Sequence, residues 1–263
     1  MVLVHGLASN LRMWDGVADG LAEAGYPVVA VDLRGHGTSP KPEVGDDAYD
    51  VATVAADVTA ATATWVAAAQ DHPTPVVLVG QSYGGTVVFE VARQLAEAGI
   101  SVAAIVGVDG GFFDLATRFD GWAECEAAMA PPRLLGTPAS AIEAHMRTAH
   151  PDWPEAGISA ALACYEVRDD ATIAPWLSYD RHIAVLHGMW KVDCAAMWAA
   201  ARVPVLLLVA TDDTEFSELK RAEAARAHLA IPTATLVEVA GDHDLHAQHP
   251  LVVARHILSV AGG

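Results

Sequence analysis

Short runs of aliphatic and β-branched residues alternate along the chain with longer amphipathic or alanine-rich stretches. Most of these runs are apolar throughout, without the period-2 alternation of a half-exposed strand, which is typical of strands covered on both faces. The runs lie at residues 2–4, 28–31, 76–79, 102–108, 205–209 and 236–239, and the candidate helices at residues 11–24, 49–70, 84–98, 216–229 and 250–260. This order predicts an α/β fold, with a mostly parallel sheet and helices on both faces.

The segment from residue 114 to residue 200 interrupts this alternation. It contains no clear β run, and prolines divide it into short helical pieces. Five of the seven tryptophans lie in it: Trp122, Trp153, Trp176, Trp190 and Trp198. We therefore predict an α/β core made of residues 1–113 and 201–263 and a helical cap, or lid, over residues 114–200. The alternative is a helical subdomain whose tryptophans only pack its own small core.

The composition is that of a folded protein with a large core. Of the 263 residues, 53% are hydrophobic and 18% are charged, which excludes a disordered chain. The net charge of −18 argues against binding to nucleic acid or to an anionic membrane surface. No secretory signal pattern is visible, and the longest apolar runs are shorter than the roughly 20 residues that cross a bilayer. We expect a cytoplasmic protein that acts on a small molecule.

The cysteines give no sign of a disulfide framework. Cys125, Cys164 and Cys194 are odd in number, widely spaced and without a C-x-x-C pair. We expect reduced, buried thiols rather than disulfides or a zinc site.

The most informative stretch is residues 77–85, Val-Leu-Val-Gly-Gln-Ser-Tyr-Gly-Gly. It combines an apolar strand, a G-x-S-x-G motif and the start of a helix. A nucleophile on such a tight strand-to-helix turn has strained backbone angles, so the residues two positions away must be small. Gly80 and Gly84 meet this requirement around Ser82. The alternative is a glycine-rich helix start in which Ser82 is only a cap.

Two further segments, Val2-Leu3-Val4-His5-Gly6-Leu7 and Asp32-Leu33-Arg34-Gly35-His36-Gly37-Thr38-Ser39, follow predicted strands. Together with the nucleophile elbow, they resemble the serine-nucleophile, cap-bearing enzymes of the α/β-hydrolase fold. The resemblance implies an oxyanion hole made by the backbone N–H groups of Leu7 and Tyr83. It also implies that His5 and His36 are structural and hold loops by hydrogen bonding. A serine at the elbow disfavours epoxide hydrolase and haloalkane dehalogenase chemistry, which in this fold uses an aspartate there.

The acid of a catalytic triad has three candidates. The strand at residues 205–209 is followed by Ala210-Thr211-Asp212-Asp213, where the family usually has G-x-x-D. By this resemblance we predict Asp213, with Asp212 as the nearest alternative; Ala210 in place of glycine is a departure. Asp109, at the end of the preceding strand, is a further alternative because some members of the fold carry the acid there. Each of these aspartates could instead cap the following helix.

The base follows the last predicted strand, in Ala240-Gly241-Asp242-His243-Asp244-Leu245-His246. This segment resembles the family's G-H-D-x-H motif, which implies His243 as the base and His246 as the alternative; Asp242 is an insertion relative to it. A metal site at the histidine cluster is the other interpretation, but its spacing lacks the i, i+4 pair of a zincin. The order Ser82, Asp213, His243 is that of the fold.

We therefore predict a serine hydrolase that cleaves a small, fairly apolar carboxylic ester through a triad and an acyl-enzyme, with no cofactor and no metal. Lactones, thioesters and C–C bonds beside a ketone are alternative substrates. A cofactor-free perhydrolase or haloperoxidase-type activity is a weaker alternative function. A hydrolase-like binding protein with little turnover is the alternative from another class. The chain is N-terminally shortened relative to the family, so we expect about six strands, an edge strand at residues 28–31 and a possible homodimer.

Overall fold

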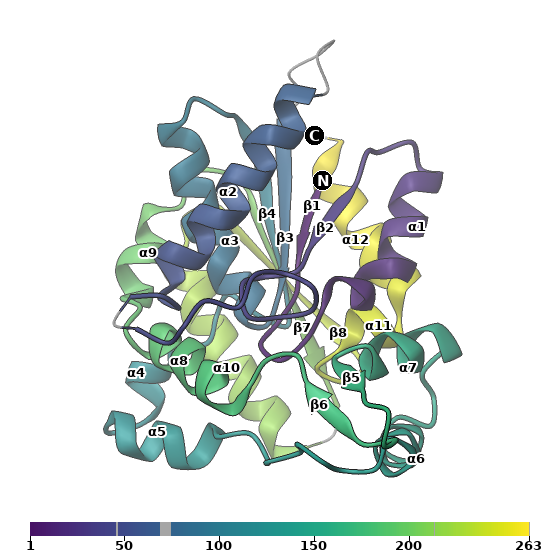
Figure 1. Cartoon of the computed structure of the whole chain (residues 1–263). Helices are drawn as coiled ribbons and strands as arrows, with labels where there is room; N and C mark the ends of the chain where they lie inside the picture. The colour runs from purple at the N-terminus through teal and green to yellow at the C-terminus, as the bar shows by residue number, and fades with distance from the viewer. Residues whose placement is uncertain (46, 69–74, 213, 263) are drawn as a thin grey trace.

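The computed structural model describes residues 1–45, 47–68, 75–212 and 214–262. A six-stranded parallel sheet forms its centre, in the order β2-β1-β3-β4-β7-β8 (Figure 1). The strands are β1 (Val2–Val4), β2 (Val29–Val31), β3 (Val76–Gln81), β4 (Val102–Val108), β7 (Val205–Thr211) and β8 (Ala234–Ala240). All six apolar runs form strands, so the predicted α/β fold is confirmed.

The burial of the strands follows their place in the sheet. β1 and β3 are buried along their whole length and β7 along nearly all of it, whereas the edge strands β2 and β8 are only partly buried. Apolar side chains on both faces are therefore needed in the centre of the sheet, which explains the continuous hydrophobic runs. The prediction that residues 28–31 form an edge strand is confirmed for the described residues. The homodimer through this edge stays a prediction.

Helices cover both faces of the sheet. On one face, the 3₁₀ turn η1 (Leu11–Trp14), α1 (Asp15–Glu23) and α12 (Pro250–Ala261) pack against the sheet. On the other face lie α2 (Val51–Ala68), α3 (Tyr83–Glu97) and α10 (Glu215–Ala230). The carboxyl ends of the parallel strands meet at one edge, and side chains far apart in sequence converge there.

Helix α2 is long and apolar enough to cross a membrane by length and composition, with a mean hydropathy of 1.3 over its 18 residues. Its buried residues, among them Val54, Ala55 and Val58, join the hydrophobic core beside α3. The core helix of a folded domain passes the same test, so α2 is weak evidence for a membrane segment.

Between β4 and β7 the chain is helical apart from one hairpin. Its elements are α4 (Leu115–Arg118), α5 (Trp122–Met129), α6 (Ala139–Ala149), α7 (Glu155–Leu162), β5 (Tyr165–Val167), β6 (Ile173–Pro175), α8 (Tyr179–Trp190) and α9 (Cys194–Ala200). The expectation that this segment has no strand was wrong, because β5 and β6 form an antiparallel pair. Each has only three residues, and the side chain of Asp170 accepts hydrogen bonds that stabilise the connecting turn. The division into a core and a cap domain stays a prediction.

The three cysteines are free, as predicted, but they differ in burial. Cys125 and Cys194 are buried, whereas Cys164 is only partly buried. Trp198 does not pack only within the insertion, which was the alternative interpretation of its tryptophans. Its indole N–H donates to the carbonyl of Gly111, and its ring packs in the main core.

Candidate active site

Ser82 lies on the turn between β3 and α3, where the sequence places the nucleophile. Its backbone angles are φ 50° and ψ −118°, a left-handed conformation that costs free energy for a residue with a side chain. The surrounding packing enforces it: a Cβ on Gly110 would lie 2.3 Å from the backbone nitrogen of Ser82, and one on Gly80 would lie 2.1 Å from the carbonyl oxygen of Gly84. The glycines are therefore required for close backbone packing at this turn.

The loop after β1 packs directly on this turn. A Cβ on Gly6 would lie 3.1 Å from the Cβ of Ser82, and Leu7 lines the same pocket as Ser82. Tyr83 is the first residue of α3, where backbone N–H groups have no acceptor within the helix. The two amides named by the resemblance thus belong to segments that meet at Ser82.

Two buried histidines hold this loop, as predicted. The Nε2 of His5 accepts a hydrogen bond from the backbone N–H of Leu33 at 3.0 Å, and its Nδ1 lies 2.8 Å from the carbonyl of Gly6. The Nε2 of His36 accepts from the backbone N–H of Ala8 at 3.2 Å. His5 and His36 are therefore structural residues beside the pocket.

His243 follows β8 and contacts Asp109, which follows β4. The Nδ1 of His243 lies 2.7 Å from Oδ2 of Asp109, whose side chain is completely buried. Because a carboxylate only accepts, Nδ1 carries the proton and Nε2 is left as an acceptor. The imidazole exposes 42% of its surface, and His243 lines the same pocket as Ser82.

The predicted acid, Asp213, lies outside the described residues. Its alternative Asp212 is exposed, and its carboxylate accepts hydrogen bonds from the hydroxyls of Thr214 and Ser217 at the start of α10. Thr214 is the N-cap of α10, and Asp212 supports the start of this helix through the two hydroxyls rather than capping it directly. Of the candidate acids in the described part of the chain, Asp109 is therefore the one that contacts His243.

Sequence reasoning missed Lys220, which also binds Asp109. Its ammonium lies 3.0 Å from Oδ2 of Asp109, and the side chain is almost completely buried. The backbone N–H of Ala210 donates to the other oxygen at 2.9 Å. A signal was present: Lys220 lies at helical spacing from the buried residues Ala224 and Ala227, so a lysine occupies the buried face of α10.

The neighbours of His243 set its basicity. Desolvation and the positive charge of Lys220 lower its pKa, but the hydrogen bond that Nδ1 donates to Asp109 and the negative charges of Asp244 and Asp109 outweigh them. The net result is a pKa above the ordinary value of a histidine. A base of this kind is suited to accept a proton from a hydroxyl near neutral pH.

The alternative base, His246, is buried away from the pocket. It is 0% exposed, its ring packs on Trp14 with the centroids 4.4 Å apart, and neither ring nitrogen has a partner among the described residues. Desolvation and the nearby charges of His243 and His5 lower its pKa to about 3. His246 is therefore a neutral core residue.

This burial predicts acid-sensitive stability. Since the folded-state pKa of His246 lies below its unfolded value, the unfolded chain binds the proton first, and stability falls as pH drops from about 6.5 toward 3. Each such histidine contributes about 1.4 kcal/mol per pH unit in that window. We expect His246→Phe to reduce the loss of unfolding free energy between pH 7 and pH 5 by about 2 kcal/mol in urea titrations. An equal reduction with His145→Phe, at an exposed position on α6, would contradict this.

The pocket at Ser82 is small and mixed in character. Its volume is about 180 Å³, and residues from the insertion form one side of it. Its lining residues are Leu7, Ala8, Ser9, Met13, Gln81, Ser82, Met146, Trp153, Ala161, Cys164, Tyr165, His243 and Asp244. Burial raises the pKa of the Cys164 thiol to about 12, so this cysteine is not a competing nucleophile.

Asp242, the inserted residue, joins the insertion to the loop that carries His243. Its Oδ2 accepts from the indole N–H of Trp153 at 2.7 Å and lies 3.2 Å from Nδ1 of His150. Its Oδ1 accepts from the backbone N–H of Asp244 at 2.9 Å. Asp242, which the family motif lacks, thus fixes the loop that carries His243 against the insertion.

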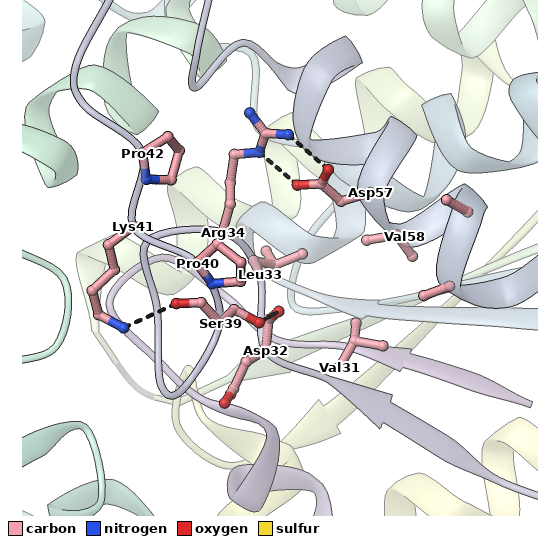
Figure 2. A pocket seen from close by; sticks show the side chains of 12 residues that line it. Val31, Asp32, Leu33, Arg34, Ser39, Pro40, Lys41, Pro42, Asp57 and Val58 are labelled. Atoms are coloured by element: carbon pink, nitrogen blue, oxygen red, sulfur yellow. Dashed lines mark hydrogen bonds and ion pairs between the residues drawn. The ribbon is translucent and has the colours of Figure 1, made fainter. Parts of the chain in front are cut away.

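A larger cavity, of about 810 Å³, lies elsewhere, against β2 and α2 (Figure 2). Its charged side chains are already paired: Arg34 forms two hydrogen bonds with Asp57, and the ammonium of Lys41 donates to the carbonyls of Gly37 and Ser39. Neither Ser82 nor His243 lines it. Within the described residues no group of three or more histidine, cysteine or acidic side chains could hold a metal ion.

Comparison with known proteins identifies the family. Residues 1–256 match the model of the alpha/beta hydrolase family. The chain belongs to this family. A curated relative of this hydrolase, 2-(acetamidomethylene)succinate hydrolase of Mesorhizobium japonicum, is 24% identical over 257 residues, which covers 98% of this chain and 86% of that protein. The first three curated relatives match only locally, so that the chain covers 18%, 32% and 30% of their lengths.

Solved structures agree on the fold. The crystal structure of E-2-(acetamidomethylene)succinate hydrolase matches this hydrolase with a TM-score of 0.74 at 23% identity, covering 100% of this chain and 91% of that one. The esterase RhEst1 from Rhodococcus sp. ECU1013 matches with a TM-score of 0.66 at 25% identity. This match covers 100% of the present chain and 90% of the RhEst1 chain. These similarities support a hydrolase of the α/β family.

Proposed function

We propose that the protein is a serine esterase that cleaves a small, uncharged or weakly polar carboxylic ester through Ser82, His243 and Asp109. One observation carries the proposal: a strained serine shares a pocket with an imidazole whose other nitrogen is bound to a buried carboxylate. Asp109 replaces Asp213 as the acid in this proposal, because Nδ1 of His243 has one proton and Asp109 accepts it. The similarity to the esterase RhEst1 supports the choice of an ester.

In the proposed mechanism, Nε2 of His243 removes the proton from the hydroxyl of Ser82 as the oxygen attacks the ester carbonyl. Asp109 holds the imidazole in the required tautomer and stabilises the imidazolium that forms. The amides of Leu7 and Tyr83 stabilise the oxyanion, and His243 then protonates the leaving alcohol. Water, deprotonated by the same imidazole, releases the acid from Ser82.

The pocket favours a small substrate. A volume of about 180 Å³ is below the range typical of drug-sized ligands, so a short acyl group fits better than a long chain. The relative from Mesorhizobium is named for a succinate, which carries two carboxylates. No lysine or arginine is among the described residues that line the pocket here. A dicarboxylate would therefore lack a cationic partner in the described pocket, which is why we propose an ester without a carboxylate.

A fluorophosphonate probe separates an esterase from a hydrolase-like binding protein. A competent Ser82 forms a covalent phosphonyl adduct, which we expect to find on the peptide that carries residue 82 by mass spectrometry.

We also expect kcat/KM to fall from p-nitrophenyl acetate to p-nitrophenyl decanoate, because the small pocket excludes the longer chain. Absence of labelling would favour the binding protein, and faster hydrolysis of a lactone or thioester than of any ester would change the substrate class.

A further inference from the structure

The pocket contains one charged side chain that the proposed mechanism does not use. Asp244 directly follows His243 and lines the pocket beside it. It precedes α11 (Leu245–Gln248), yet its side chain makes no capping hydrogen bond. In the described part of the chain, no donor binds its carboxylate. The neighbouring Asp242 is different, because its carboxylate is fully engaged by Trp153, His150 and the backbone of Asp244.

The charge of Asp244 acts on both sides of the pocket. It raises the pKa of His243 beside it and contributes to the raised pKa of Cys164, which belongs to the insertion. Desolvation raises the pKa of Asp244 itself. Removing a carboxylate from water costs free energy unless a cation or a hydrogen-bond donor compensates for it. A ligand that supplied such a group would therefore gain more here than in open solvent.

The remaining walls suit a cation as well. Trp153 and Tyr165 line the same pocket, and aromatic faces attract ammonium groups. The described lining residues include no lysine or arginine to oppose a positive charge. The protein as a whole carries a net charge of −18, which favours the approach of cations and disfavours that of anions.

We infer that Asp244 is a specificity-determining residue, which selects esters that carry a positive charge close to the scissile bond and disfavours esters that carry a carboxylate. This inference rests on the proposed ester hydrolysis at Ser82. It assigns Asp244 no part in the bond-breaking steps. The carboxylate binds the cationic part of the substrate while Ser82 attacks the carbonyl.

Three acetate esters of similar size and different charge test this inference. Acetylcholine is cationic, 3,3-dimethylbutyl acetate is its neutral counterpart, and 4-acetoxybutanoate is anionic. We expect the charge of Asp244 to raise kcat/KM for acetylcholine above that for the neutral ester by about tenfold to hundredfold, and the anionic ester to be the poorest substrate. In Asp244→Asn the cationic-to-neutral ratio should fall by about tenfold or more, which leaves only the weaker attraction of the aromatic faces for the cation. Comparing two substrates on one variant at one pH cancels any change in the basicity of His243 and in the folded fraction.

Asp19→Asn is the matched control, since it makes the same chemical change at an exposed position on α1, outside the pocket. It should leave the ratio within about twofold of wild type, because an exposed charge at a distance is screened. A ratio that Asp244→Asn does not change would overturn the inference while leaving ester hydrolysis intact. If none of the three esters is cleaved, calorimetry of Ser82→Ala with choline and with 3,3-dimethylbutan-1-ol decides the matter. Equal binding of the two alcohols would again overturn the inference, whereas failure of turnover alone contradicts only the proposed function.

Discussion

Replacing Ser82 with alanine is expected to abolish the hydrolysis of p-nitrophenyl acetate, with kcat reduced by about 10³-fold to 10⁶-fold. The hydroxyl is the proposed attacking group, because Ser82 lies on the strained turn after β3 and shares the pocket with His243. The thiol of Cys164 lines the same pocket, but burial raises its pKa to about 12. The fold should survive, because alanine removes only one oxygen. Initial rates with purified protein, together with a thermal unfolding curve, measure both effects.

The control for this experiment is Ser101→Ala, which removes the same hydroxyl at an exposed position before β4. It should hydrolyse p-nitrophenyl acetate at the wild-type rate. Activity of Ser82→Ala close to that of the control would show that another residue is the nucleophile, and it would remove the basis of the proposed function.

The strands and the nucleophile turn were predictable because each depends on a strong local requirement. The central strands must be apolar on both faces, and this leaves continuous runs such as the one in β7. The turn at Ser82 needs glycine where backbones approach within van der Waals distance, as at Gly80. These constraints act within a few residues, so they are visible in the sequence without knowledge of the fold.

The features that the sequence did not predict depend on long-range contacts or on weak local signals. The hairpin of β5 and β6 has three residues in each strand, too few to show a periodic pattern. The sequence offered Asp109 only as a further alternative acid, because its contact with His243 joins positions 134 residues apart. Whether an aspartate caps a helix or binds a histidine is decided by such packing, and the local sequence is similar in the two cases. Asp242 likewise became interpretable only through Trp153, its partner in the insertion.

Replacing Asp109 with asparagine is the second change with a large expected effect. An amide cannot stabilise the imidazolium of His243 and favours the wrong tautomer, so we expect kcat for p-nitrophenyl acetate to fall by about 10⁴-fold. The hydrogen bond and charge of Asp109 raise the pKa of His243, so their loss lowers it. The residual activity should therefore persist to lower pH than that of wild type. Rates measured from pH 4 to pH 9 test the magnitude and the direction together.

Asp109→Asn has a structural cost that must be separated from the catalytic one. The ammonium of Lys220 is almost completely buried and lies 3.0 Å from Asp109, so the single variant leaves a buried charge without its partner and is expected to lose about 3–5 kcal/mol of stability. Replacing Lys220 with methionine in the same protein removes that charge and should recover much of the stability without recovering the rate. Asp212→Asn and Asp213→Asn complete the comparison. Both should keep most of the wild-type rate, because Nδ1 of His243 has a single proton to donate and Asp109 already accepts it. A loss of about 10⁴-fold in Asp213→Asn, with Asp109→Asn nearly as active as wild type, would make Asp213 the acid of the triad.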